Sequence, residues 1–281
     1  MSDDPLRAAL AGVRGLLLDL DGVIVARNQL LPGVAEALAT LDRRGLPFRI
    51  VTNTSATSRV GLAGFGRSLG LTIPPERIVS CLSVSAAWTA RRFPGQPLYV
   101  LASPDARTEF QGQHLLEHAE AARPGASAAA VVVGDSPADV RYDVLNAAFR
   151  LVLGGAALIA MHRNRWWVTP DGPGLDSGAV VAGLEFATGR RARVMGKPAP
   201  AFFREGLHEL GNGMPAGDVA MVGDDVWSDV LAAQRVGLRG VFVLSGKHGQ
   251  PELARAAAQA RGGGRPTAVA PSLAEVVAAL D

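Results

Sequence analysis

Short apolar runs alternate with longer amphipathic segments along the chain. The first run starts at Gly15 and leads through leucines to two carboxylates, Asp19 and Asp21, which precede Gly22. A short apolar run that ends in a glycine is typical of a strand buried on both faces of a parallel sheet. The stretch 34–44 then repeats its apolar residues at i, i+4 and i+7, which is typical of a helix packed on that sheet.

This alternation recurs in the first and last parts of the chain and predicts one parallel sheet for both. Further strands are expected at 48–52, directly before Lys197, at 219–223, at 241–244 and near 267, and helices at about 57–69, from Pro200, around Asp229 and up to Leu280. Strands that alternate with helices pair in parallel. We therefore expect an α/β fold with a doubly wound parallel sheet, in which the carboxyl ends of the strands meet at one edge.

The middle of the chain carries its own strands and helices and predicts an inserted domain. Strand patterns lie at 98–102, 129–134, 158–161 and 166–169, and a helix pattern lies at 140–153. A segment of about 100 residues is enough for a small domain. We expect a core domain of residues 1–79 and 179–281 and an inserted α/β cap domain of residues 80–178. Inside the cap, Gly134 and Asp135 are expected to form a surface turn.

Composition and charge narrow the class of protein. Of 281 residues, 48% are hydrophobic and 19% are charged, which is typical of a folded protein. The net charge of +2 favours no nucleic-acid partner, and no apolar stretch approaches the length of a membrane helix, so no membrane partner is expected either. A single cysteine, Cys81, and an acidic first segment without a hydrophobic run fit a cytoplasmic protein without a secretory signal.

Lysine is rare in this chain and is a candidate marker of a site. Of the 28 basic residues, only Lys197 and Lys247 are lysines, and the rest are arginines. A compact ammonium and a planar guanidinium suit different partners. A lysine in such a chain can therefore mark a position that needs a point charge, although two lysines can also arise by chance.

Polar side chains follow four of the predicted strands at the point where each strand ends. They are Asp19 and Asp21, Thr52 and Asn53, Lys197, and Asp224 and Asp225. Carboxylates around a hard cation suit Mg²⁺, because this ion prefers oxygen ligands and keeps several waters. The hydroxyl, amide and ammonium groups add donors for an anion that the metal also contacts. The sequence therefore predicts a Mg²⁺ site with a small phosphorylated substrate as its partner.

The chain carries four motifs, DLDGVI, VTNTS, GKPAP and VGDDVWSD, in the order typical of haloacid dehalogenase (HAD) phosphatases. The insertion between the second and third motifs resembles class IIA of this superfamily, the NagD-like and p-nitrophenyl phosphatase-like proteins. The stretch GLEFATGRRARVMGKPAPAFF is similar to the branch that contains phospholysine phosphohistidine inorganic pyrophosphate phosphatase. The resemblance covers nearly the whole chain and implies a Rossmann-like HAD core with an α/β cap.

The resemblance implies a role for each residue of the first and last motifs. Asp19 would be the nucleophile that forms an aspartyl-phosphate, and Asp21 would act as general acid and then as general base. The side chains of Asp19 and Asp224 and the backbone carbonyl of Asp21 would hold Mg²⁺. Several members of the phosphohistidine branch carry Ser where this chain has Asp21. The aspartate favours a fully equipped phosphatase and weakens the transfer of that branch's substrates.

The remaining motif residues would serve the phosphoryl group. Thr52, Asn53 and Lys197 would bind its oxygens, as the resemblance implies. Either one of Asp225 and Asp229 would reach the metal through water, or both would orient Lys197. The cap would close over the site and exclude water, as lids do.

Three functions are consistent with these patterns. The first is a Mg²⁺-dependent phosphatase acting on small phosphorylated compounds. The second is a phosphoamide (phosphohistidine or phospholysine) or inorganic pyrophosphate hydrolase, which the branch resemblance implies. The third is a non-catalytic binding or scaffold protein that kept the HAD fold, although a scaffold has no chemical need for the full residue set. The resemblance also leaves open a homodimer through the cap, with Trp166 and Trp167 as candidate contacts.

Overall fold

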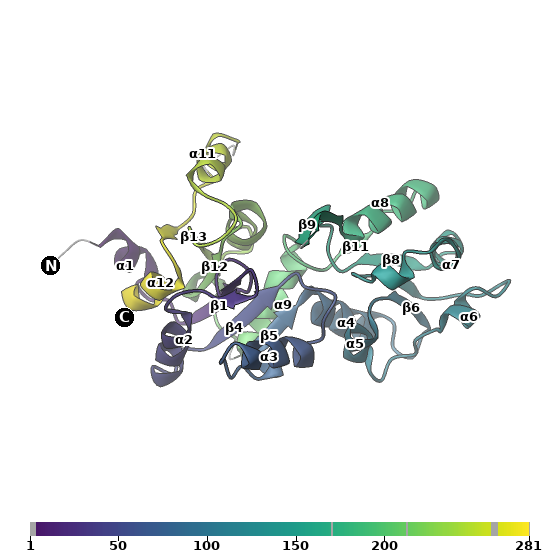
Figure 1. Cartoon of the computed structure of the whole chain (residues 1–281), viewed down its shortest axis with the longest axis horizontal. Coiled ribbons are helices and arrows are strands. Elements are labelled where there is room, and N and C mark those ends of the chain that lie inside the picture. The colour runs from purple at the N-terminus through teal and green to yellow at the C-terminus, as the bar shows by residue number, and fades with distance from the viewer. Residues whose placement is uncertain (1–3, 170, 212, 260–263, 281) are drawn as a thin grey trace. The chain divides into compact units, whose positions relative to one another are not determined.

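The chain folds into two units, each with its own sheet (Figure 1). The computed structural model describes residues 4–169, 171–211, 213–259 and 264–280. The first unit contains Met1–Thr52, Ala63–Val79 and Lys197–Asp281, and the second contains Asn53–Leu62 and Ser80–Gly196.

A six-stranded sheet forms the centre of the first unit. Its strands, in spatial order, are β14 (Ala268–Ala270), β13 (Arg239–Val243), β12 (Val219–Gly223), β1 (Gly15–Asp19), β4 (Phe48–Thr52) and β5 (Ile78–Ser80). The pairs from β14 to β4 are parallel. Every residue of β1 and of β12 is buried, as the continuous apolar runs predict for strands covered on both faces. A short antiparallel pair, β2 (Val25–Ala26) and β3 (Gln29–Leu30), follows β1.

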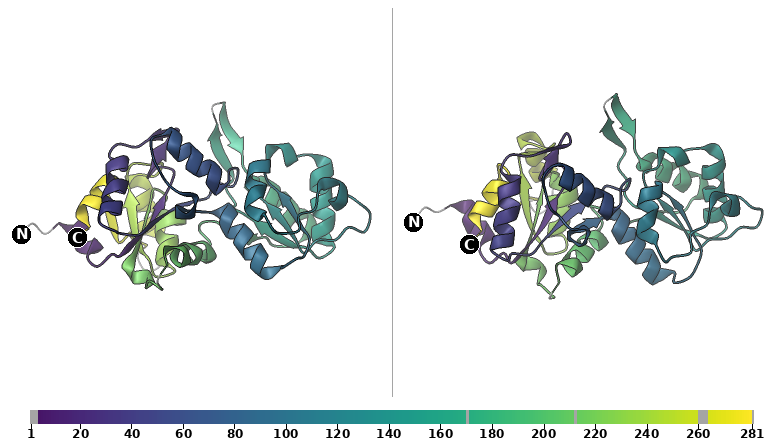
Figure 2. Two further views of the ribbon diagram at one scale, coloured as in Figure 1. Left: turned by 90° about the horizontal axis from the view of Figure 1, so that it is seen from below. Right: turned by 60° about the horizontal axis from the view of Figure 1, so that its bottom comes forward.

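Helices lie on both sides of this sheet (Figure 2). They are α1 (Pro5–Leu10), α2 (Val34–Arg43), α3 (Arg59–Ser68), α9 (Pro200–Leu210), α10 (Ala232–Gln234), α11 (Gln250–Gln259) and α12 (Leu273–Ala279), with short turns at Pro75–Arg77 and Ala216–Asp218 and a π-helical turn at Val226–Leu231. The predicted apolar stripe of α2 is buried. The prediction of an α/β fold with a doubly wound parallel sheet is confirmed. None of the helices that the structure describes is long and apolar enough to cross a bilayer.

The second unit has a four-stranded parallel sheet. Its order is β11 (Arg193–Val194), β8 (Ala157–Ala160), β7 (Ala130–Val133) and β6 (Leu98–Leu101), and β9 (Trp166–Thr169) and β10 (Gly172–Leu175) form a separate antiparallel pair. The helices are α4 (Cys81–Arg92), α5 (Pro104–Arg107), α6 (His118–Ala121), α7 (Tyr142–Leu153) and α8 (Ser177–Thr188), with short turns at Thr108–Phe110 and Pro137–Asp139. Side chains of α7, α8 and the strands share one buried core.

The second unit takes more of the chain than the predicted cap of residues 80–178. β11 pairs with β8, so the segment that includes α8 and β11 completes this sheet rather than the core sheet. The segment 53–62 also groups with this unit, because the N–H and Oγ of Ser58 donate to the Asp105 carboxylate at 2.7 and 2.9 Å. These contacts lie far apart in the sequence, and β11 spans only two residues, so a pattern of hydrophobic positions does not show them.

The predicted surface turn at Gly134 and Asp135 is wrong. Gly134 is buried, and Asp135 is half-buried with its N–H donating to Ser55 Oγ at 2.9 Å. A Cβ atom at Gly134 would lie 2.5 Å from Met161 Sδ. The glycine is therefore required by close packing, and the position was mistaken for a turn because both demands select the same residue type.

Candidate active site

The carboxyl ends of three neighbouring strands meet at one edge of the core sheet. β1 ends at Asp19, β4 ends at Thr52, and Asp224 follows β12 directly. β1 lies between the other two strands, and the parallel register pairs Asp19 with Val51 of β4 and Leu18 with Val222 of β12, one residue before the end of each neighbouring strand. Tertiary structure thus brings three of the predicted site residues to the edge where open α/β sheets bind their ligands.

Lys197 bridges two buried carboxylates at this edge. Its Nζ atom lies 2.7 Å from Asp19 Oδ1 and 2.8 Å from Asp229 Oδ1. The three residues are 5%, 6% and 0% exposed, respectively. Asp19 Oδ1 also accepts a hydrogen bond from the N–H of Leu20 at 2.8 Å. The orientation of the Asp19 carboxylate is therefore fixed by an ammonium and a backbone N–H.

Burial and charge set the protonation of this cluster. Burial raises the pKa of Asp19, Lys197 opposes this rise, and the nearby Asp224 adds to it. Burial and the charge of Asp19 raise the pKa of Asp229 to about 7, despite the Lys197 ammonium. Burial by itself lowers the pKa of Lys197, but Asp19 and Asp229 outweigh it and raise that pKa. Lys197 thus stays charged, and the carboxylates around it keep a surplus of negative charge.

Three carboxylates are close enough to hold a cation together. Asp19, Asp224 and Asp229 each offer an oxygen, and these oxygens lie within 4.8 Å of one another. The side chain of Asp21 is exposed and stands outside this group of described residues. Desolvation raises the pKa of Asp21, Lys197 opposes the rise, and Asp224 adds to it. Hard oxygen ligands of this kind suit a divalent cation.

The loop after β13 supports Asp224 and was not predicted as part of the site. The N–H of Lys247 donates to Asp224 Oδ2 at 2.7 Å, and Ser245 Oγ donates to the carbonyl of Gly22 at 2.7 Å. A Cβ atom at Gly22 or at Gly246 would collide with the Asp224 carboxylate. The rarity of lysine was the one sequence signal for this loop, because Lys247 is one of only two lysines.

Asp225 and Asp229 have different contacts, although both were predicted to act near Lys197. Asp229 forms the ion pair with Lys197 described above. Asp225 Oδ1 accepts from two N–H groups at the start of the π-helical turn, both at 2.9 Å, and its Oδ2 lies 3.1 Å from Lys247 Nζ. The N–H of Asp225 donates to Asp229 Oδ2 at 3.1 Å. Asp225 therefore caps the turn that carries Asp229.

Asn53 follows Thr52 in the chain but groups with the second unit. Thr52 is 1% exposed at the end of β4. The carbonyl of Asn53 accepts from Cys81 Sγ at 3.1 Å. A Cβ atom at Gly196 would press against Asn53 Oδ1, so this glycine leaves room for the amide. The predicted roles of Thr52 and Asn53 toward a phosphoryl group stay predictions.

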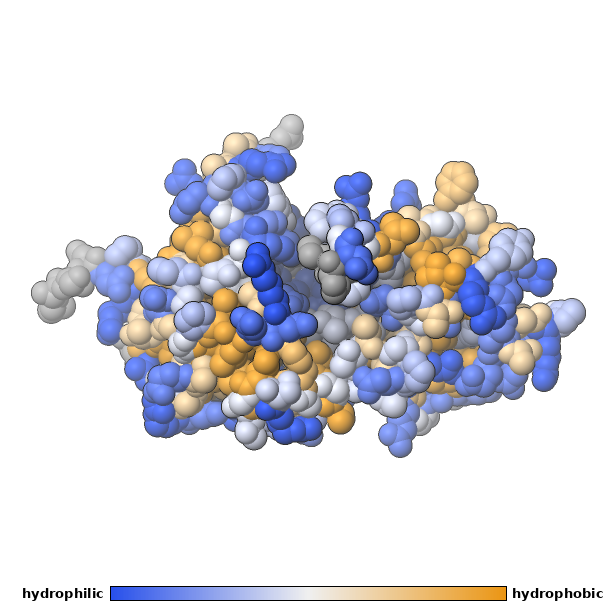
Figure 3. Space-filling model, in the orientation of Figure 1, coloured by the Kyte–Doolittle hydropathy of each residue, from blue (hydrophilic) through white to orange (hydrophobic). Residues whose placement is uncertain are grey.

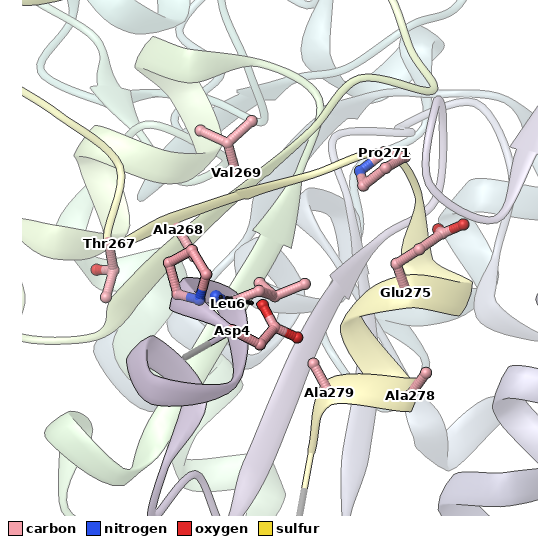
Figure 4. A pocket seen from close by; sticks show the side chains of 10 residues that line it. Asp4, Leu6, Thr267, Ala268, Val269, Pro271, Glu275, Ala278 and Ala279 are labelled. Carbon is pink, nitrogen blue, oxygen red and sulfur yellow. Dashed lines mark hydrogen bonds between the residues drawn. The ribbon is translucent and has the colours of Figure 1, made fainter. Parts of the chain in front are cut away.

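A pocket of about 530 Å³ lies in the first unit, next to the edge strand β14 of the six-stranded sheet. Figure 4 shows side chains of α1, β14 and α12 around it, among them Leu6, Val269 and Glu275. None of the predicted site residues is among the described residues that line it. The carboxyl edge of the sheet, and not this pocket, is the candidate active site.

Comparison with known proteins identifies the family. A family model described as haloacid dehalogenase-like hydrolase matches residues 16–115, and one described as HAD-hydrolase-like matches residues 194–276. Haloacid dehalogenase-like hydrolase domain-containing protein 2 of Homo sapiens is 35% identical over 86% of this chain and 88% of that protein. The chain belongs to the haloacid dehalogenase-like hydrolase family.

Two further HAD proteins similar to this chain are phosphatases by name. Phospholysine phosphohistidine inorganic pyrophosphate phosphatase of Homo sapiens is 33% identical over 86% of this chain and 87% of that protein. The structure of p-nitrophenyl phosphatase from Archaeoglobus fulgidus superposes with a TM-score of 0.83 at 30% identity, covering 95% of this chain and 99% of that one. The predicted class IIA resemblance and the predicted enzyme class, a HAD phosphatase, are confirmed.

Proposed function

We propose that this HAD protein is a Mg²⁺-dependent phosphatase that hydrolyses small phosphorylated compounds through an aspartyl-phosphate intermediate. The observation that carries the proposal is the buried cluster of Asp19, Lys197 and Asp229 with Asp224 beside it. Buried charges of this density are costly in a protein without a ligand that uses them. A divalent cation would supply the missing positive charge, and the cation and the Lys197 ammonium together would then attract a phosphoryl group.

The donor set fits a divalent cation. We assign Mg²⁺ to the carboxylates of Asp19 and Asp224, with the backbone carbonyl of Asp21 as a third ligand, as the HAD resemblance implies. Asp229 also lies within reach of such a cation. We assign its carboxylate to the ion pair with Lys197, at the edge of the metal site. The raised pKa values of Asp19 and Asp224 support this assignment, because burial and like charges leave both without full compensation. When bound, the cation offsets the repulsion between the Asp19 carboxylate and the phosphoryl oxygens.

Asp19 and Asp21 divide the covalent and the proton-transfer chemistry. An oxygen of Asp19 attacks phosphorus, the bond from phosphorus to the leaving oxygen breaks, and an aspartyl-phosphate forms. Asp21 donates its proton to the leaving oxygen, and then removes a proton from the water that attacks the aspartyl-phosphate. The raised pKa of Asp21 supports this role, because it keeps more of the carboxyl protonated before the first step. The second step returns phosphate and the free Asp19 carboxylate.

The phosphoryl oxygens need donors on their other sides. We assign these to Thr52, Asn53 and Lys197. The ammonium of Lys197 is held in place by Asp19 and Asp229, so it is oriented before the substrate binds. Asp225 acts indirectly, because it caps the turn that positions Asp229.

Asp19→Asn tests the mechanism. The variant removes the nucleophile and should abolish the Mg²⁺-dependent release of p-nitrophenol from p-nitrophenyl phosphate, with an unchanged far-ultraviolet circular dichroism spectrum. Asp42→Asn, an exposed substitution on α2, serves as a matched control and should keep full activity. Activity that survives in Asp19→Asn would refute Asp19 as the nucleophile.

A substrate panel separates the two enzymatic candidates and the scaffold alternative. It should contain sugar phosphates, nucleotides, inorganic pyrophosphate, phosphohistidine and phospholysine. The named activity of the phosphohistidine relative supports including the last three. Turnover of phosphomonoesters supports the proposal, turnover of the P–N or pyrophosphate compounds alone supports the alternative, and no turnover with any metal supports a scaffold. The homodimer through the cap and the cytoplasmic location stay predictions.

A further inference from the structure

The second unit contains a pocket of its own between α7 and α8, which we call the interhelical pocket. It measures about 620 Å³. The last residues of β6 and β7, Leu101 and Val133, line it together with residues 134–136, so it lies beyond the carboxyl ends of these strands. Parallel α/β sheets bind ligands at this end. Figure 3 shows hydrophobic side chains on the part of the surface that carries α7 and α8 in Figure 1.

The sequence of α8 leaves the space for this pocket. Its lining residues Ala179, Gly183 and Ala187 recur every four positions, so this row of the helix carries little side-chain volume. Val180 and Leu184 of the same helix also line the pocket. Across the pocket, α7 contributes Leu145 and Phe149. A Cβ atom at Gly183 would meet no atom within 4 Å. The pocket therefore offers apolar walls and unfilled space for the body of a ligand.

Two hydrogen-bonding groups in the interhelical pocket have no hydrogen-bond partner among the residues that the structure describes. Ser136 is only 8% exposed, and its hydroxyl makes no hydrogen bond within the part of the chain that the structure describes. The N–H of the neighbouring Asp135 donates to Ser55 Oγ, whereas its carboxylate accepts none from the described residues. The Ser136 residue is buried, and a buried polar group without a partner is unfavourable, whereas Asp135 is half-buried. A ligand that donates hydrogen bonds would satisfy both groups.

The charges that line the interhelical pocket are all negative. They belong to Asp135, Asp139 and Asp176, and no Lys, Arg or His is among the described lining residues. Asp176 Oδ1 accepts from the N–H of Ser177 at 2.6 Å and lies 3.6 Å from His162 Nε2. Burial lowers the pKa of His162 despite these carboxylates, so the imidazole supplies no cation at neutral pH. Burial and Asp176 raise the pKa of Asp135, as expected where a counter-charge is missing.

We propose that the interhelical pocket binds a small organic ammonium ion with an apolar body. The body lies between α7 and α8, and the ammonium contacts the Asp135 carboxylate and the Ser136 hydroxyl. Charge complementarity selects this occupant. An anion would face three carboxylates, and a neutral apolar molecule would leave Asp135 and Ser136 without partners. The described lining residues all belong to the second unit, so the proposal does not depend on the proposed phosphatase chemistry.

Calorimetric titration of the full chain with two matched probes tests the charge requirement. Tryptamine carries an indole body and an ammonium, and tryptophol carries the same body with a hydroxyl in place of the ammonium. Tryptamine should bind with one saturable site and about tenfold more tightly than tryptophol, because a charged hydrogen bond is stronger than a neutral one. Equal affinities, or no saturable binding of tryptamine, would overturn the proposal.

Asp135→Asn tests the residue that carries the charge. The variant keeps the shape of the side chain. It should weaken the binding of tryptamine by about tenfold and leave the affinity for tryptophol unchanged. Asp143→Asn removes a carboxylate on α7 that does not line the pocket, and it should change either affinity by less than about twofold. An equal loss in both variants would mean that general surface charge attracts the amine, and would overturn the assignment to Asp135.

Gly183→Leu tests whether the probes bind in the interhelical pocket. Leucine at this exposed helical position fills the pocket without a clash and is a better helix former than glycine, so the fold should be kept. Both probes should then lose binding, whereas Ala182→Leu, on the same helix outside the lining, should leave both affinities unchanged. Tryptamine binding that survives Gly183→Leu would refute the pocket. A molar mass by light scattering that falls in Gly183→Leu would assign the pocket to a second copy of the chain and also refute the proposal.

The amine could be free or could be part of a phosphorylated substrate, and kinetics separate these two sources. Competitive inhibition of p-nitrophenyl phosphate turnover by tryptamine assigns the pocket to the alcohol part of an amine-bearing substrate. Saturable binding with unchanged turnover assigns it to a separate amine ligand. A chain with no turnover would defeat the proposed function, and the calorimetric titration would still decide the pocket.

Discussion

The two lysines of this HAD protein make a matched pair for testing the charge balance of the site. Lys197 is 5% exposed and binds Asp19 and Asp229, whereas the Lys247 side chain is 60% exposed and binds Asp225. Replacing either residue by methionine keeps much of the side chain's length and removes the ammonium. The prediction concerns the free energy of unfolding of the two variants without metal.

Lys197→Met should lose far more stability than Lys247→Met. Breaking a buried ion pair by removing one partner costs about 3–5 kcal/mol, because the remaining charge stays buried. In Lys197→Met, the carboxylates of Asp19 and Asp229 both lose their counter-charge. An exposed pair contributes at most about 1 kcal/mol, so Lys247→Met should lose no more than that.

The stability loss of Lys197→Met should depend on pH in a defined direction. Lys197 opposes the raised pKa of Asp19 and of Asp229, so its removal raises both further. The carboxyl groups then have higher pKa values in the folded variant than in the unfolded chain. At pH values between these two, the folded variant binds more protons than the unfolded chain. Its stability should therefore fall as pH rises from about 5 to about 8. Added Mg²⁺ should restore part of the loss, because a cation bound by the carboxylates replaces the missing charge.

Urea unfolding, followed by circular dichroism in the presence of EDTA and then of Mg²⁺, measures these quantities at several pH values. Equal losses of stability in the two variants would contradict the charge compensation assigned to Lys197. A loss in Lys197→Met that does not change with pH would contradict it as well. Either result would mean that the ammonium of Lys197 does not compensate buried carboxylates.

Three further predictions concern single positions of the site. The pKa of Asp229 near 7 lies above its unfolded value of 3.8, so the metal-free wild type should lose stability relative to Asp229→Asn as pH rises through this window; a gain would contradict the pKa shift. Gly246→Ala should weaken Mn²⁺ binding, measured by electron paramagnetic resonance, by about tenfold or more, because its Cβ would collide with the Asp224 carboxylate. Gly249→Ala would make only ordinary contacts and should leave Mn²⁺ binding unchanged. Asp21→Asn should slow the hydrolysis of alkyl phosphates more than that of p-nitrophenyl phosphate, because a good leaving group needs no proton; equal losses in kcat would count against Asp21 as the acid.

Two strands of the core could be predicted to the residue. The predicted strands at 48–52 and 219–223 coincide with β4 and β12. Residues 219–223 are apolar or glycine at every position and are all buried, and residues 48–52 are buried except for the partly buried Arg49, so both strands have the strongly apolar composition of strands covered on both faces. The helices were placed less closely, because periodicity fixes the buried face of a helix better than its ends.

The contacts that hold the site residues in place could not be predicted in the same way. The N–H of Lys247 reaches Asp224 across 23 positions of the chain, and Gly246 is needed only because that carboxylate lies against it. The extent of the second unit was missed for a similar reason, since β11 joins its sheet through pairing with β8. Neither contact leaves a local pattern of hydrophobic and polar residues.

The sequence by itself determined the α/β class, the carboxylates at the ends of two strands and the resemblance to the HAD phosphatases, because these depend on residue type and local order. Only the tertiary structure decided that Lys197 pairs with both Asp19 and Asp229, and that Asp225 caps the turn beneath them. The same is true of the space beside Gly183, which exists because two helices meet there with small residues on one face. Distances between side chains depend on how strands and helices pack, and packing joins residues that are far apart in the chain.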